Sequence, residues 1–286
     1  MRFLISADEH VCLRRKGVDK VFEKNRYEQL FDKLLNIDAD VVLHCGDMFD
    51  RTPTIEETAL VVEYLNSANK PTIIIDGNHE ATKKGETFLT LLRAMIYNER
   101  VFIISDITVF PKYDLTVIPY CQLSKLPITP ITKYAMTHVR GEIPPHVKAE
   151  IDLTLLKGFH AVFAGDLHDR NCSQLNILYP GSPLTTHFYR EPVDFKGVFI
   201  YDTDTDTRQD INLNLPQLIK SSVEVTDSNN FVTVEKIPIE VLVDSSESIL
   251  TKEVSRVDAL AEVIKDTSTL ERVVNLYLEV CNGQNT

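Results

Sequence analysis

The sequence predicts an α/β protein with two packed β-sheets, followed by a small α+β domain at its C-terminal end. Three observations lead to this prediction. The first hundred residues alternate short apolar runs with amphipathic stretches, which is the pattern of a doubly wound sheet. The next hundred contain many strand-like segments and few helical ones. The pattern changes again at Pro216, which divides the chain into residues 1–215 and residues 216–286.

The first hundred residues follow the order β-α-β-α-β-α-β. Apolar β-branched runs of four to five residues indicate buried parallel strands. Apolar residues at helical spacing predict the first helix, and Thr52 or Thr54 is a suitable N-cap for the second. The predicted elements cover residues 3–7, 21–36, 41–45, 54–68, 72–75, 87–97 and 101–104.

Short strands dominate the following hundred residues. Because few helical stretches separate them, we expect a second, more antiparallel sheet that packs on the first. The acidic repeat at 202–207 lacks the Gly and the final Glu of a calcium loop, so we interpret it as a polar hairpin turn. The predicted strands cover residues 107–110, 115–119, 134–137, 161–164, 176–178, 197–201 and 209–213.

The C-terminal domain is predicted to combine strands at 222–225, 233–236 and 240–243 with a long amphipathic helical stretch at 254–280. The apolar stripe of that stretch is expected to cover the domain's own sheet. The alternative is that its last part docks on a partner protein, as an amphipathic helix in a groove.

Composition excludes several classes of protein. No apolar run approaches the roughly 20 residues that span a bilayer, and the chain begins with a strand, so we expect neither a membrane partner nor a signal peptide. Five cysteines without a Cys-x-x-Cys motif favour reduced thiols in a cytoplasm. The net charge of −12 argues only weakly against a nucleic-acid partner, because bound divalent ions would add positive charge where a substrate must bind.

Five of the predicted strands end in residues that bind metals. Since the carboxyl ends of parallel strands share one edge of a sheet, we expect these side chains to converge. Carboxylate, amide and imidazole ligands without thiolate suit Mn²⁺ or Fe²⁺ better than a cysteine-based zinc site. Each motif alone would be weak, but their occurrence together predicts a metal centre. The residues concerned are Asp8, His10, Asp47, Asn78, His138, Asp166 and His168.

This combination suits the hydrolysis of a phosphate ester. Asp47 can bridge two ions roughly 3.5–4 Å apart, which activate a water molecule and neutralise the phosphate. His79 follows the ligand Asn78 directly, so we expect it to protonate the leaving group, with Asp50 orienting its imidazole. His44 lies within a strand and is expected in the core.

Two further sets of residues are candidates for substrate contacts. The basic run Arg14-Arg15-Lys16 lies in the loop after the first strand, close to the predicted site. It can contact a phosphate backbone, although a solvated loop is the more common role of such a run. His187 is a second candidate, because it lies near the segment that follows the last predicted ligand.

The motifs resemble those of the calcineurin-like metallophosphoesterases. These motifs are Asp8-x-His10, Gly46-Asp47-x-x-Asp50, Gly77-Asn78-His79-Glu80, His138 and Gly165-x-x-His168. Three further segments are similar to the SbcD / meiotic-recombination-eleven DNA nucleases, among which phage recombination nucleases are similarly short. They are Ile118-Pro119-Tyr120, Tyr179-Pro180-Gly181-Ser182-Pro183 and Lys196-Gly197-Val198-Phe199. The resemblance covers residues 1 to about 215.

The resemblance implies a division of the ligands between two ions. Metal one would be held by Asp8, His10, Asp47 and His168, and metal two by Asp47, Asn78, His138 and Asp166. The sequence departs from the family at two positions. The family usually has His where Asp166 stands, and the nuclease branch often pairs its catalytic His with a second His, where this chain has Asp50.

The implied function is that of a Mn²⁺-dependent DNA exonuclease or endonuclease subunit in end processing, recombination or repair, with Mg²⁺ or Fe²⁺ as alternative ions. Its implied partners are DNA, a coiled-coil ATPase of the SbcC type and a second copy of the chain. The C-terminal domain would correspond to the DNA-capping domain of these nucleases. The expected location is the cytoplasm, that of the host if the gene is viral. A phosphomonoesterase or protein phosphatase and a non-catalytic scaffold remain as alternatives.

Overall fold

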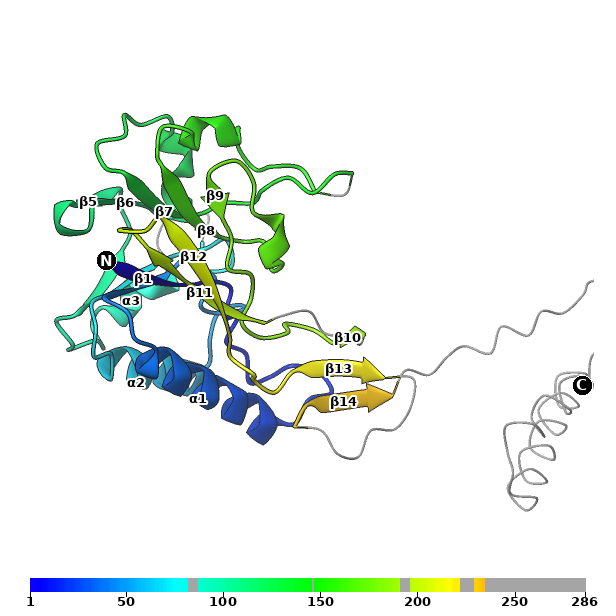
Figure 1. The fold of residues 1–286 in the computed structure, drawn as a ribbon. Coiled ribbons are helices and arrows are strands. Elements are labelled where there is room, and N and C mark those ends of the chain that lie inside the picture. Colours follow the sequence, from blue (N-terminus) through cyan, green and yellow to red (C-terminus); the bar gives the residue numbers. More distant parts are fainter. Residues whose placement is uncertain (82–86, 146, 191–195, 222–228, 235–286) are drawn as a thin grey trace, which may run out of the picture. The chain divides into compact units, whose positions relative to one another are not determined.

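The computed structural model describes residues 1–81, 87–145, 147–190, 196–221 and 229–234 (Figure 1). These residues belong to one compact unit, which spans Met1–Glu235. The first part of the unit contains β1 (Arg2–Ser6), α1 (Lys20–Asn36), β2 (Val41–His44), α2 (Ile55–Asn66), β3 (Thr72–Ile75), α3 (Phe88–Leu92) and β4 (Val101–Ile104).

The second part is richer in strands and in short 3₁₀ helices. Its elements are β5 (Thr108–Phe110), η1 (Pro111–Tyr113), β6 (Leu115–Ile118), η2 (Tyr120–Lys125), β7 (Tyr134–His138), η3 (Leu153–Leu156), β8 (Ala161–Gly165), η4 (Arg170–Cys172), β9 (Ile177–Leu178), β10 (Tyr189–Arg190), β11 (Gly197–Asp202), β12 (Thr207–Asn212), β13 (Leu218–Ser221) and β14 (Phe231–Val234).

The first sheet has the strand order β12-β11-β1-β2-β3-β4, with β1 to β4 parallel. Successive residues of a strand point to opposite faces, and both faces of this sheet are buried. Leu4 packs with α1 and α2, whereas Phe3 and Ile5 pack towards the second sheet. The apolar runs of the sequence are therefore continuous because each strand has two buried faces.

The two main helices begin at well-formed caps. The Asp19 side chain accepts a hydrogen bond from the Phe22 backbone at the start of α1. Thr54 and Glu57 form a reciprocal capping box at the start of α2, which confirms one of the two caps predicted from the sequence. Both helices lie along the face of the first sheet that points away from the second sheet (Figure 1).

The second sheet has the strand order β5-β6-β7-β8-β9 and is mostly parallel, since only the β5–β6 pair is antiparallel. The expectation of a more antiparallel sheet is therefore wrong. The connections from β6 to β7 and from β7 to β8 are long enough to cross over, and they contain η2 and η3 in place of α-helices. The outer face of this sheet packs against these connections.

The β11–β12 hairpin belongs to the first sheet, where β11 pairs antiparallel with β1. Phe199 and Tyr201 face the core between the sheets, and Val198 and Ile200 face the helices. The predicted hairpin turn at 202–207 is confirmed. The expectation that this hairpin belongs to the second sheet is wrong, because β11 has two apolar faces and can be buried beside β1.

The third helix ends earlier than expected, at Leu92 instead of near residue 97. The residues beyond it bond to neighbouring elements. Arg93 donates to the carbonyl of Ile103 in β4, and the Asn98 amide donates to three carbonyls at the end of α2. These side-chain contacts hold the segment after α3 against β4 and α2.

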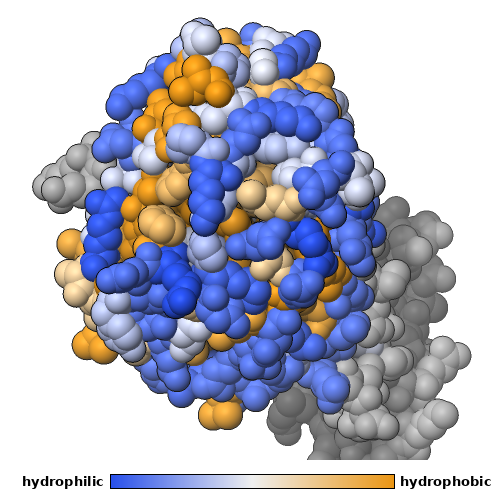
Figure 2. Space-filling model, turned by 60° about the vertical axis from the view of Figure 1, so that its left-hand side comes forward, coloured by the Kyte–Doolittle hydropathy of each residue, from blue (hydrophilic) through white to orange (hydrophobic). Residues whose placement is uncertain are grey.

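A small parallel sheet joins β10, β13 and β14. The predicted strand at 233–236 overlaps β14, while the strands at 222–225 and 240–243 and the helical stretch at 254–280 lie outside the described residues. The domain boundary at residue 216 stays a prediction. In the described part of the chain, no helix is both long and apolar enough to cross a bilayer. The face in Figure 2 is largely hydrophilic, with apolar side chains in separate groups.

Candidate metal centre

The seven predicted metal ligands lie together at one edge of the two sheets. Six of them lie within four residues of the carboxyl ends of β1, β2, β3 and β8, and His138 is the final residue of β7. The two sheets therefore contribute to one site, as the sequence predicts. Asp8, His10, Asp47 and His138 are almost completely buried.

The backbone at the site is strained. Asp8, His10, Asp47 and Asp166 all have positive φ, at 56°, 47°, 57° and 99°. Non-glycine residues rarely adopt this region, and such residues concentrate at functional sites. Hydrogen bonds between the loops after β1 and β2 hold the geometry, because Asp8 N donates to Gly46 O and His10 N to Asp47 O, both at 3.0 Å. The backbone N–H of Asp166 donates to the Asp8 carboxylate at 3.0 Å.

Asp47 stands between two groups of ligands. Its Oδ2 is 3.7 Å from Nε2 of His10 and 3.6 Å from Nε2 of His138. On the His10 side, Asp8, His10 and His168 offer ligand atoms within 4.8 Å of one another. On the His138 side, Nε2 is 3.0 Å from Oδ1 of Asn78 and 3.7 Å from Oδ1 of Asp166. If each group held an ion, Asp47 would therefore be within reach of both.

The imidazole of His138 is oriented by the backbone. Its Nδ1 lies 2.8 Å from the carbonyl oxygen of Cys45. Since a carbonyl only accepts, Nδ1 carries the proton and Nε2 faces the site, which is the arrangement that second-shell partners impose on metal-binding histidines.

The carbonyl of His10 accepts a hydrogen bond of 2.6 Å from the Tyr27 hydroxyl, which fixes the His10 backbone.

Burial and mutual charge strongly shift the pKa values of the site's residues. Burial raises the pKa of both Asp8 and Asp47. Burial alone would lower the pKa of His138, but the charges of Asp47, Asp8 and Asp166 raise it to about 10. On the other side, burial and the charge of Lys196 lower the pKa of His168 to about 4. Buried carboxylates and a cationic imidazole therefore face one another at this site.

These residues fit divalent cations. The Nε2 atoms of His10 and His168 face each other at 3.0 Å, and burial together with the neighbouring histidines lowers the pKa of His10 well below its usual range. Two neutral imidazoles whose nitrogens point into one buried space, beside carboxylates, form a ligand set. Carboxylate oxygen and imidazole nitrogen are common ligands of divalent metals in proteins.

Glu80 connects the loops after β2 and β3. Its buried carboxylate accepts hydrogen bonds from the backbone of Phe49 at 2.7 Å, Gly77 at 2.9 Å and Asp47 at 3.1 Å. Burial and the charge of Asp47 raise its pKa to about 8. Glu80 was part of a motif in the sequence, but this positioning role was not predicted. Three backbone donors from two loops become visible only in the structure.

A second buried network lies behind the site. Glu9, between two ligands, accepts from the Ser6 hydroxyl and lies 2.8 Å from Nδ1 of His44, and Nε2 of His44 lies 2.7 Å from the Tyr64 hydroxyl. The prediction that His44 belongs to the core is confirmed, since it is completely buried. The network ties the loop after β1 to β2 and α2.

His79 and Asp50 meet in a different way from the one expected. Nδ1 of His79 lies 2.5 Å from the backbone carbonyl of Asp50, whereas the Asp50 carboxylate lies 3.7 Å from Nδ1 of His10. The expected carboxylate–imidazole pair is therefore replaced by a carbonyl–imidazole pair. Nε2 of His79 is 4.0 Å from Asp47 Oδ2, so the ring still points towards the metal ligands.

The predicted substrate contacts have different surroundings. Arg15 is largely buried in a salt bridge of 2.8 Å to Glu23, and Arg14 bonds to Glu57 and to the carbonyl of Thr52. Lys16 is exposed.

His187 is also exposed. It lies close to His168, and the charge of His187 helps to lower the pKa of His168. Lys196, which was noted in the sequence only as part of a motif, also lies there, with Nζ 3.4 Å from the His168 carbonyl oxygen.

Comparison with known proteins agrees with this geometry. The family model of the calcineurin-like phosphoesterases matches residues 1–138. The chain is 35% identical to a protein of Escherichia phage T5 named "Probable exonuclease subunit 1", over 96% of this chain and 88% of that protein. It is also 29% identical to the "DNA double-strand break repair protein Mre11" of Methanococcus maripaludis, over 36% of this chain and 34% of that protein.

Among solved structures, the fold is similar to that of the protein TT1561 of Thermus thermophilus, with a TM-score of 0.50 and 12% identity, over 74% of this chain and 99% of that one. The fold and the site define a metal-dependent phosphoesterase, a hydrolase of phosphate esters. The chain belongs to the calcineurin-like phosphoesterase family, and its relatives in that family include the phage T5 protein.

Proposed function

We propose that the chain is a Mn²⁺-dependent DNA nuclease subunit that hydrolyses phosphodiester bonds with two metal ions. The observation that carries the proposal is the position of Asp47 between two ligand groups that come from both sheets. The likeness to the phage T5 protein, over nearly the whole chain, supports DNA as the substrate. The complete ligand set speaks against a scaffold without catalysis.

The proposed assignment of ligands follows the two groups. Asp8, His10, Asp47 and His168 would hold one ion, and Asp47, Asn78, His138 and Asp166 the other. When bound, the ions supply Lewis-acid chemistry, which lowers the pKa of a water molecule and neutralises the phosphate oxygens. The donor set has hard oxygens from three carboxylates and one amide, so Mn²⁺ is the proposed ion and Mg²⁺ or Fe²⁺ the alternatives.

The chain's own residues do the remaining work. The Asp50 carbonyl accepts from Nδ1 of His79, which fixes the ring and leaves Nε2 directed towards the metal ligands. Nε2 can then deliver a proton to the oxygen that leaves the phosphorus. His79 is 37% exposed, so solvent can return that proton after each turnover.

We propose that the chain works in an assembly. The phage T5 relative is named as a subunit. The proposed partners are an SbcC-type coiled-coil ATPase and a second copy of this chain, in the cytoplasm of the cell or of the infected host. Sedimentation of the purified chain tests the dimer, and a dependence of duplex cleavage on ATP after addition of the ATPase tests the partner.

The nuclease function is tested by assaying the purified chain with Mn²⁺ and with a chelator. The substrates are linear DNA, the phosphodiester bis-p-nitrophenyl phosphate and the monoester p-nitrophenyl phosphate. Asp47→Asn should be inactive, and Asp32→Asn on the exposed side of α1 is the matched control. Cleavage of the monoester alone would favour a phosphatase over a nuclease.

A further inference from the structure

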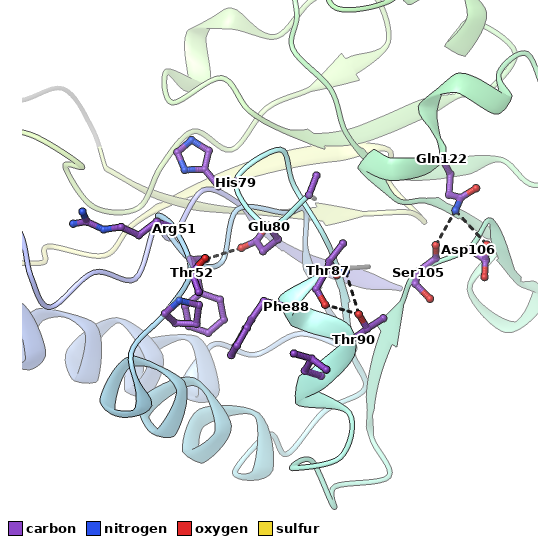
Figure 3. A pocket seen from close by; sticks show the side chains of 14 residues that line it. Arg51, Thr52, His79, Glu80, Thr87, Phe88, Thr90, Ser105, Asp106 and Gln122 are labelled. Carbon is purple, nitrogen blue, oxygen red and sulfur yellow. Dashed lines mark hydrogen bonds between the residues drawn. The ribbon is translucent and has the colours of Figure 1, made fainter. Parts of the chain in front are cut away.

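A cavity of about 710 Å³ adjoins the metal centre on the side of His79 (Figure 3). The loops after β2, β3 and β4 form its walls together with α3 and η2. It therefore opens at the same sheet edge as the metal ligands. A cavity of this size holds one small organic group, whereas a DNA duplex is far too large for it.

His79 stands between the metal ligands and this cavity. Its ring lines the cavity, and its Nε2 faces Asp47 at 4.0 Å. An oxygen that takes a proton from His79 belongs to the group that leaves the phosphorus. That group must therefore begin beside His79, and the cavity is the space into which it extends.

The lining combines apolar surface with polar groups of both charges. Phe88 packs edge-on against the buried Phe49 at 5.6 Å, and Leu91 is 66% exposed. Figure 3 shows His79 and Arg51 at one end and Asp106 with Gln122 at the other. One arginine opposite one aspartate provides no excess of positive charge, so the cavity is not built for a run of phosphates.

Gln122 adds a hydrogen-bonding group to the far wall. Its amide nitrogen donates to the carbonyl of Ser105 at 3.1 Å and to the carboxylate of Asp106 at 3.2 Å. Its Oε1 is buried and has no hydrogen-bond partner among the described residues. The two hydrogen bonds of the amide nitrogen fix this wall, because they tie η2 to the loop after β4.

We propose that this cavity binds the nucleobase of the leaving nucleotide, unstacked from its neighbours, against Phe88 and Leu91. The proposal rests on the proposed nuclease function and adds to it a site that favours single-stranded or frayed DNA. Base stacking on apolar and aromatic side chains is tolerant of sequence, so the cavity selects strandedness more than base identity.

The test uses single-stranded oligonucleotides in which one residue lacks its base, on either side of a chosen phosphate. The end that gains a free hydroxyl identifies the leaving side. An abasic residue on the leaving side should slow cleavage of that phosphate by about tenfold, as expected for the loss of one stacked base. An abasic residue on the other side should have a much smaller effect.

A substitution in the cavity should remove this difference. The Leu91→Asp variant is expected to cleave intact substrates and substrates abasic on the leaving side at similar rates. Ile131 is similarly exposed, so the Ile131→Asp variant should keep the parent's ratio of these two rates. If abasic residues on either side leave the rate of DNA cleavage unchanged, the proposed role of the cavity is overturned and the nuclease function stands. Failure to hydrolyse both DNA and bis-p-nitrophenyl phosphate would overturn the nuclease function as well. Hydrolysis of a phosphopeptide but not of DNA would assign the cavity to a peptide.

Discussion

The metal-free protein should lose stability as the pH rises from 6.5 to 8. In this window two buried groups, Glu80 and His138, hold a proton in the folded state more strongly than in the unfolded state. Burial and the charge of Asp47 raise the pKa of Glu80 from 4.5 to about 8. The carboxylates around His138 raise its pKa from 6.5 to about 10, against the effect of burial. Since the folded state binds more protons, its stability falls with pH.

The size of the effect follows from the width of the window. Over about 1.5 pH units, each group can lower the free energy of unfolding by at most about 2 kcal/mol. For a domain of this size the sum corresponds to a fall in Tm of roughly 5–15 °C. His10 and His168 have lowered pKa values and act with the opposite sign, and because both have an unfolded-state pKa near 6.5 they offset part of this fall at the lower end of the window.

Mn²⁺ should reverse the trend. The ion competes with the proton on His138 and neutralises Asp47, so the stabilisation that it provides should grow with pH. The assay is thermal unfolding at pH 6.5, 7, 7.5 and 8, with a chelator and with Mn²⁺. A Tm that stays constant or rises with pH in the chelator would refute the reasoning.

Glu80→Gln separates the two contributions. The variant cannot titrate, so its Tm in the chelator should fall about half as steeply with pH. It should also be less stable at pH 6.5, because its NH₂ group must face at least one of the backbone donors that the carboxylate now satisfies. Glu142→Gln, at an exposed position, should keep the slope of the parent.

Three further predictions concern the proposed reaction. His79→Ala should lower kcat by about 10²–10⁴ while two metals still bind, and near-normal nuclease activity would exclude His79 as the acid. Asp166→His should keep two metals and shift the preference away from Mn²⁺, because nitrogen replaces a hard oxygen. One metal per parent chain in titration calorimetry would exclude Asp166 as a ligand. In Gly77→Ala the new Cβ would overlap the Asp47 carboxylate and backbone, so metal binding measured by calorimetry should be lost, and tight binding would contradict this packing.

The convergence of the proposed ligands could be predicted because they lie shortly after strand ends. A buried strand is visible as an apolar run, and parallel strands deliver their last residues to one edge. The order of the parallel strands is therefore enough to predict that Asp8, Asp47 and Asn78 lie close together. His138 and Asp166 come from the second sheet, and they were predicted by the same rule although the pairing of that sheet was not.

The direction of the strands was harder to predict. Long connections without α-helices suggested antiparallel strands, but the segments with η2 and η3 serve as crossovers. The β11–β12 hairpin could have belonged to either sheet, because both sheets offered an edge. The antiparallel pairing of β11 with β1 places the hairpin in the first sheet.

The contacts that position the site depend on backbone atoms, which residue identity does not specify. Asp50 suggested a carboxylate partner for His79, but its carbonyl is what the imidazole meets, and the carboxylate turns towards His10. Glu80 binds backbone N–H groups of two loops in the same way. A substitution at residue 50 should therefore affect His79 only if it moves the main chain. The group that holds the His79 ring is a backbone carbonyl, which any residue type at position 50 would offer.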